Sequence, residues 1–98
     1  MKVLLICAGG MSTSILMKKL KTYAKEQEMD FDVIAKGLGD YVDVFTEYDV
    51  LLLGPQVSYK CNDIRNITQK PVAVIPQLDY ALGKADNIFK LISEVMAQ

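Results

Sequence analysis

Four short apolar segments alternate along the chain with segments whose apolar residues recur at helical spacing. Residues 3–7, 50–53 and 72–75 are apolar throughout. In residues 31–36, Phe31, Val33 and Ala35 alternate with the other positions, and both patterns are typical of strands. The run at 50–53 is continuously apolar, as a strand buried on both faces is. Strands that alternate with helices pair in parallel through right-handed crossovers, so the pattern predicts an α/β fold.

The predicted helices are placed by the same periodicity. The apolar faces are Leu16, Leu20, Tyr23 and Ala24 in segment 13–28, Tyr41, Val44, Phe45 and Tyr48 in 41–48, and Ile88, Leu91, Ile92 and Val95 in the last helix. The predicted N-caps are Asp40, Asp86 and, for a helix ending near residue 69, Ser58 or Asn62. We expect Ile64 and Ile67 of that helix to face inward. Residues 77–85 are predicted to form a loop or broken turn.

Together these elements predict one domain, residues 1–98, built on a single four-stranded parallel sheet of order 2-1-3-4 with helices on both faces. In this order strands 1 and 3 are neighbours whose crossovers leave on opposite faces, which opens a crevice at their carboxyl ends. Cys7 ends the first strand, and Gly54, Pro55 and Gln56 follow the third. The predicted functional site is therefore at this edge.

A loop of small and hydroxyl-bearing residues joins the first strand to the first helix, directly after Cys7. Backbone N–H groups at a helix start favour an anion, and the same position favours a thiolate, so we expect a lowered pKa for Cys7. The residues expected to bind a phosphoryl group are Ala8, Gly9, Gly10, Met11, Ser12, Thr13 and Ser14. The alternative is that Cys7 is simply a packed cysteine at a strand end.

Composition narrows the remaining chemistry. Eleven basic and twelve acidic side chains balance, which argues against a nucleic-acid partner. No apolar run is long enough to span a bilayer, so a cytoplasmic chain is expected.

Two cysteines without histidine predict neither a disulfide framework nor a metal site, and no cofactor is expected. Without histidine, a covalent phosphoryl group would be carried by Cys7, a hydroxyl or a carboxylate, and Cys7 is the best placed. Cys61 is predicted to be a structural or surface thiol.

Lysines cluster on the predicted outer face of the first helix, at Lys18, Lys19, Lys21 and Lys25. Such a cluster is usually a solvated face. The alternative is a docking rim for an acidic partner beside the reactive loop.

The segments 7–14, 51–56 and 70–75 together resemble the lactose/cellobiose-type IIB component of the bacterial phosphoenolpyruvate-dependent sugar phosphotransferase system. The resemblance runs from Lys2 almost to the carboxyl terminus. The cellobiose branch often has a serine after the cysteine and a single glycine before Met-Ser-Thr-Ser. This chain has Ala8 and Gly9 instead, which removes one hydroxyl donor. No catalytic role is carried onto Asp79 or Tyr80.

The resemblance implies that Cys7 accepts a phosphoryl group from a phosphohistidine of a IIA protein. Cys7 would then pass the group to a sugar bound by the membrane IIC component, with a β-linked disaccharide such as cellobiose, chitobiose or lactose as the expected sugar. Gln56 would support the site from behind the phosphoryl-binding residues. The chain would be peripheral to the inner face of the membrane through IIC, without inserting into it.

Three other classes of protein share some of these features. A low-molecular-weight phosphotyrosine phosphatase or an arsenate reductase has a similar loop, but needs arginine six residues after the cysteine, where this chain has Thr13. Asp79 would be the general acid in that class. A nucleotide-binding module would need a glycine pattern that Gly9 and Gly10 do not supply. An interaction domain with an inert cysteine remains open.

Overall fold

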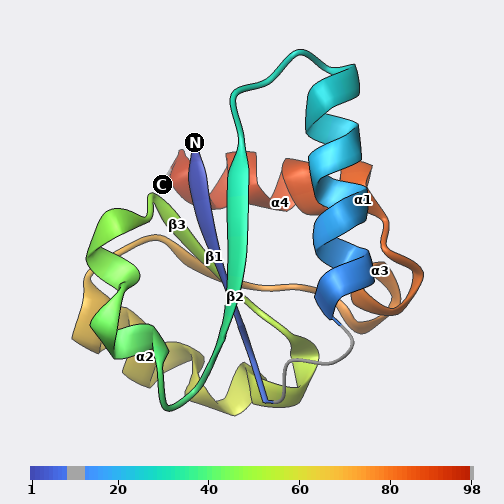
Figure 1. Cartoon of the computed structure of the whole chain (residues 1–98). Helices are drawn as coiled ribbons and strands as arrows, with labels where there is room; N and C mark the ends of the chain where they lie inside the picture. The colour runs from blue at the N-terminus through green and yellow to red at the C-terminus, as the bar shows by residue number, and fades with distance from the viewer. Residues whose placement is uncertain (9–12, 98) are drawn as a thin grey trace.

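A parallel four-stranded sheet forms the centre of the protein. The structure is a computed structural model that describes residues 1–8 and 13–97. The strands are β1 (Lys2–Cys7), β2 (Asp32–Gly37), β3 (Val50–Leu53) and β4 (Val72–Val74), in the order β2-β1-β3-β4 (Figure 1). The predicted strand order is therefore confirmed, as is its parallel pairing.

The strand register places the carboxyl ends of the three neighbouring strands β2, β1 and β3 at one edge. Cys7 pairs with Gly37 of β2, and Ile6 pairs with Leu53 of β3. The Gly54 N–H donates to the Ile6 carbonyl oxygen at 2.9 Å, which continues the ladder by one residue. Cys7 and the Gly54 turn therefore border the same edge of the sheet, as the sequence predicts.

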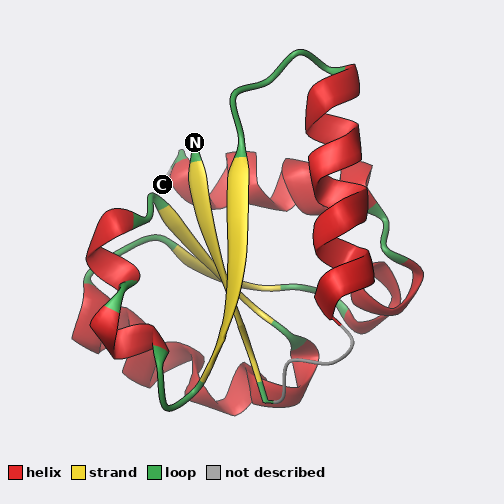
Figure 2. Cartoon of the chain, viewed as in Figure 1, coloured by secondary structure: helices red, strands yellow, loops and turns green. Residues whose placement is uncertain are grey.

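Helices cover both faces of the sheet (Figure 2). Helices α1 (Thr13–Glu26), α3 (Gln77–Leu82) and α4 (Ala85–Met96) cover one face, where Leu5, Leu52 and Ile88 are fully buried. The 3₁₀ helices and α2 (Cys61–Thr68) cover the other, over Leu4 and Leu51. Strand residues thus alternate between two apolar clusters, and the continuous apolar runs of β1 and β3 fill both.

The segment 41–48 differs from the predicted single helix. It forms two 3₁₀ helices, η1 (Tyr41–Asp43) and η2 (Phe45–Glu47), separated by Val44 at φ −129°. Asp40 precedes η1 but its side chain makes no capping hydrogen bond. The predicted apolar positions still turn inward, with Tyr41 and Tyr48 buried, because burial needs only the spacing and not an α-helical backbone.

Several helix boundaries were also predicted wrongly. A 3₁₀ helix, η3 (Pro55–Lys60), precedes α2, and the N-cap of α2 is Lys60 rather than Ser58 or Asn62. Ile64 is buried as predicted, but Ile67 is 54% exposed. The N-cap of α4 is Lys84 rather than Asp86. The N-cap residues of α2 and α4 are lysines, and neither makes a side-chain capping hydrogen bond. The preference for serine, asparagine or aspartate at an N-cap therefore misplaced both helix starts.

Residues 77–85 contain helix α3, where a loop or broken turn was predicted. The helix begins after Pro76 and ends at Gly83, whose φ of +64° is the left-handed conformation that glycine tolerates. Lys19 of α1 donates from Nζ to the Leu82 carbonyl oxygen at 3.1 Å. A carbonyl left unpaired at the helix end is thereby satisfied from a neighbouring helix, which no local pattern reveals.

Candidate functional site

The thiol of Cys7 is buried where β1 ends, with 2% of the residue exposed. Its Sγ lies 3.9 Å from the Lys36 carbonyl oxygen of β2, to which the thiol donates a weak hydrogen bond. Among the described residues, Cys7 belongs to neither apolar cluster, although Ile6 and Leu5 before it belong to one each. The thiol is therefore enclosed at the sheet edge and not within a side-chain core.

Thr13 is the first residue of α1 and is 1% exposed. Burial raises the pKa of the Cys7 thiol, while a hydrogen bond with the Thr13 side chain acts in the opposite direction and lowers that pKa. Burial is the larger of the two causes, so the pKa of Cys7 lies above its ordinary value. The prediction of a lowered pKa was wrong, because it considered the helix end and not the enclosure of the sulfur.

We expect Thr13→Val to raise the pKa of Cys7 further, because valine keeps the packing but removes the hydroxyl that favours the thiolate. The measurement is the rate of Cys7 alkylation by iodoacetamide against pH, in a Cys61→Ser background where Cys7 is the one thiol of the sequence. In the parent, the pKa of Cys7 should itself lie above that of an ordinary thiol, which is about 8.5. Thr13→Ser retains a hydroxyl and should stay near the parent; a Thr13→Val midpoint at or below the parent's would refute this role.

The predicted phosphoryl-binding residues are only partly placed. Ala8 follows Cys7 and is exposed, and Ser14 is exposed on the first turn of α1. Thr13 lies beside the Cys7 thiol, with which its side chain forms a hydrogen bond. The remaining predicted residues, Gly9, Gly10, Met11 and Ser12, lie outside the described residues.

Gly54 and Gln56 border the site from β3, and Tyr80 of α3 closes around them. A Cβ atom at Gly54 would lie 3.0 Å from the Gln56 Oε1 and 3.3 Å from the Tyr80 ring. The Gln56 side chain is exposed and turns back over the glycine, so it lies at the predicted edge. Tyr80 was given no role from the sequence. The one sequence signal for Tyr80 at this site is its position shortly after β4, the strand that follows β3.

The other sequence candidates lie away from the thiol or in ordinary environments. Asp79 accepts a hydrogen bond from the Asn87 side chain at 3.0 Å, which joins α3 to α4. Cys61 is a free, half-buried thiol that packs against the cluster under α2. The predicted lysine face is exposed, at Lys18, Lys19, Lys21 and Lys25.

Two searches of the described part of the chain bear on metal and membrane chemistry. Over residues 1–8 and 13–97, no three histidine, cysteine, aspartate or glutamate side chains are grouped to hold a metal ion. Over the same residues, no helix has the length and apolar character needed to cross a membrane.

Solved structures with the same fold include two proteins of one class. The lactose-specific IIB component domain from Streptococcus pneumoniae superposes with a TM-score of 0.83 and 20% identity, covering 95% of each chain. The cellobiose-specific phosphotransferase IIB component from Borrelia burgdorferi superposes with a TM-score of 0.80 and 28% identity, covering 99% of this chain and 92% of that one. The fold is that of IIB domains.

Sequence comparison identifies the family. The model of the family described as "PTS system, Lactose/Cellobiose specific IIB subunit" matches residues 2–91. The galactose-specific EIIB component of Lactococcus lactis subsp. cremoris is 32% identical over 96% of this chain and 94% of its own length. The cellobiose-specific EIIB component of Lactococcus lactis subsp. lactis is 31% identical over the same shares. The chain belongs to the lactose/cellobiose-specific IIB family and is a phosphotransferase component of a sugar phosphotransferase system.

Some relatives carry the matched region within a much longer chain. The lactose-specific EIICB component of Staphylococcus epidermidis is 34% identical over 68 residues, which are 69% of this chain and 12% of that protein. In such relatives the B and C components are one polypeptide, as their name states.

Proposed function

We propose that Cys7 is a phosphoryl relay. It accepts the group from a phosphohistidine of a IIA protein and delivers it to a sugar, a β-linked disaccharide such as cellobiose, chitobiose or lactose, bound by a IIC component. The observation that carries the proposal is the pairing of the Cys7 thiol with Thr13 at the start of α1, on the edge where β1 and β3 end. The joined B and C components in relatives support a IIC partner.

The chemistry consists of two displacements at phosphorus. In the first, the Cys7 sulfur gives up its proton to solvent and attacks phosphorus, forming an S–P bond as the P–N bond to the IIA histidine breaks. In the second, a sugar hydroxyl oxygen attacks, the S–P bond breaks, the thiolate is restored and the hydroxyl proton is released. Because burial raises the pKa of Cys7, the resting sulfur is a thiol, and Thr13 is the described group that favours its deprotonation.

Arg65 gives a reason to favour relay over hydrolysis. It is the one arginine in the sequence, and its guanidinium donates to the Val72 carbonyl oxygen at 3.0 Å, where β4 begins. The amino end of a parallel strand lies at the edge opposite Cys7. An arginine clamp on the phosphoryl oxygens, the strongest contact a phosphatase of the similar class would use, is therefore not supplied by this chain.

Exposed apolar side chains beside the site fit the docking of the IIA protein. Ile15 of α1 is 68% exposed, and Leu78 and Leu82 of α3 are 71% and 54% exposed. Ile15 lines a cavity of about 240 Å³ with Tyr80 and Gly83, so α1 and α3 meet there. Because Ile15 comes two residues after Thr13, an exposed apolar side chain there suits a partner that must reach Cys7.

We expect Ile15→Lys to slow phosphoryl transfer from the phosphorylated IIA protein roughly tenfold, because a charge replaces an apolar anchor of the complex. The measurement is the single-turnover rate at subsaturating IIA. Val42→Lys is the matched control, since Val42 is 52% exposed on η1 and lies outside this surface. Equal rates for the two variants would count against docking at α1 and α3.

Exposure to a phosphorylated IIA protein separates the candidate functions. The relay takes up one phosphoryl group in an acid-sensitive thiol linkage and holds it until an acceptor arrives. A phosphatase releases inorganic phosphate to water. An inert interaction domain does neither, and the proposal fails in both of those cases.

A further inference from the structure

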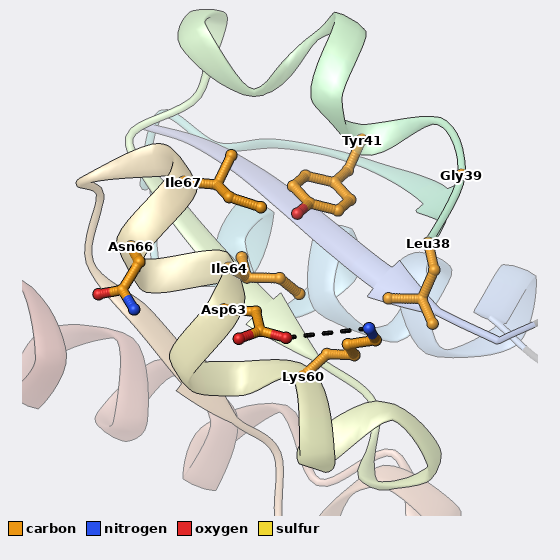
Figure 3. Close-up of a pocket in the computed structure, with 8 residues that line it drawn as sticks. All are labelled: Leu38, Gly39, Tyr41, Lys60, Asp63, Ile64, Asn66 and Ile67. Carbon is orange, nitrogen blue, oxygen red and sulfur yellow. Dashed lines mark ion pairs between the residues drawn. The ribbon is translucent and has the colours of Figure 1, made fainter.

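A cavity of about 510 Å³ opens between η1 and α2, on the face of the sheet that carries the cluster under α2. Its volume falls in the range of ordinary small-molecule sites, roughly 300–1,000 Å³. The lining residues are Leu38, Gly39, Tyr41, Lys60, Asp63, Ile64, Asn66 and Ile67 (Figure 3).

The Tyr41 hydroxyl is the feature of this cavity that points to a ligand. The residue is 5% exposed, and its hydroxyl has no hydrogen-bond partner among the residues that the structure describes. Since no fully enclosed side-chain oxygen or nitrogen in that part of the chain lacks a partner, this oxygen borders open space. Figure 3 shows it directed into the cavity, toward Ile64. The hydroxyl is therefore free to donate a hydrogen bond to a molecule that enters the cavity.

The remaining lining defines the chemistry of that ligand. Leu38, Ile64 and Ile67 present aliphatic surface, which suits an apolar body. The charges of Lys60 and Asp63 balance, with Nζ and Oδ2 3.8 Å apart, so the cavity carries no net charge. Burial and the Asp63 carboxylate raise the pKa of Tyr41, which keeps its hydroxyl protonated and able to donate.

We propose that this cavity binds a small uncharged compound whose apolar body packs on Leu38, Ile64 and Ile67 and whose oxygen accepts a hydrogen bond from Tyr41. The site goes beyond the phosphoryl relay, because its residues belong to the other face of the sheet from α1 and do not include Cys7. Leu38 and Gly39 directly follow Gly37, the register partner of Cys7, so the two sites share the loop after β2.

The test is a titration of the whole chain, followed by amide NMR, with three probes of one ring size: cyclohexanol, cyclohexanecarboxylate and cyclohexylammonium. We expect saturable shifts at the lining residues with cyclohexanol, and binding several-fold weaker for both charged probes. A charged probe that binds as tightly as cyclohexanol, or the absence of saturable shifts at these residues, would overturn the proposal.

Two variants locate the ligand. Tyr41→Phe removes only the hydroxyl and should weaken cyclohexanol binding about three- to tenfold, whereas Tyr59→Phe, at a 72% exposed tyrosine outside the lining, should not. Gly39→Val adds a branched side chain at a lining residue and should weaken cyclohexanol binding without unfolding the protein, because a Cβ atom there meets nothing within 4 Å. Unchanged affinity in Tyr41→Phe contradicts the site. Cys7→Ser should bind cyclohexanol normally, so failure here is distinguishable from failure of the relay.

Discussion

Replacing Cys7 by serine is expected to reduce phosphoryl uptake from a phosphorylated IIA protein to less than about one thousandth of the parent rate. The substitution changes one atom in a residue that is 2% exposed, so the fold should remain and the loss should be chemical. A serine hydroxyl is a far weaker nucleophile than a thiolate in the same position. The measurement is transfer of labelled phosphate from the IIA protein to the chain.

Cys61→Ser is the matched control for this prediction. Cys61 is a free thiol at the start of α2, half-buried against the cluster there, and it has no place in the proposed transfer. The variant should take up phosphate at the parent rate. Uptake that survives in Cys7→Ser and disappears in Cys61→Ser would mean that the wrong cysteine has been assigned.

Leu52→Ala is expected to lower the free energy of unfolding by about 2–5 kcal/mol, the range for truncating a buried leucine. Leu52 is fully buried in β3, where it pairs with Leu5 on one side and Ala73 on the other. The cavity left behind would be enclosed by the sheet and by the helices of the α1 face. Chemical denaturation monitored by circular dichroism measures the change.

Leu78→Ala provides the comparison at an exposed leucine. Leu78 is 71% exposed on α3, so its truncation should alter stability by no more than about 0.5 kcal/mol. If the two leucine variants lost equal stability, β3 would not be the centre of the core that the register describes.

The sheet could be predicted from the sequence because its signals are long and redundant. Residues 3–7 of β1 and all of β3 are apolar, and only a strand covered on both faces can bury such a run. Once four strands alternate with helices, parallel pairing and handedness leave few orders to consider. The order 2-1-3-4 is one of these few, and it is favoured in part because it brings Cys7 and Gly54 to one edge, as the structure does.

The details that failed depend on tertiary contacts. Helix α3 is six residues long, and the Lys19 ammonium of α1 satisfies a carbonyl at its end. The pKa of Cys7 depends on how completely the folded chain encloses the sulfur, which spacing along the sequence does not report. Tyr80 reaches the Gly54 turn from a helix that local patterns read as a loop.

The most direct measurement is the location of the phosphoryl group after incubation with a phosphorylated IIA protein. Phosphorus NMR should report a single S-phosphocysteine, and peptide mapping by mass spectrometry should place it on Cys7. Addition of the IIC component with its sugar should then discharge it to the sugar. Phosphate found on another residue, or none retained on the chain, would contradict the account.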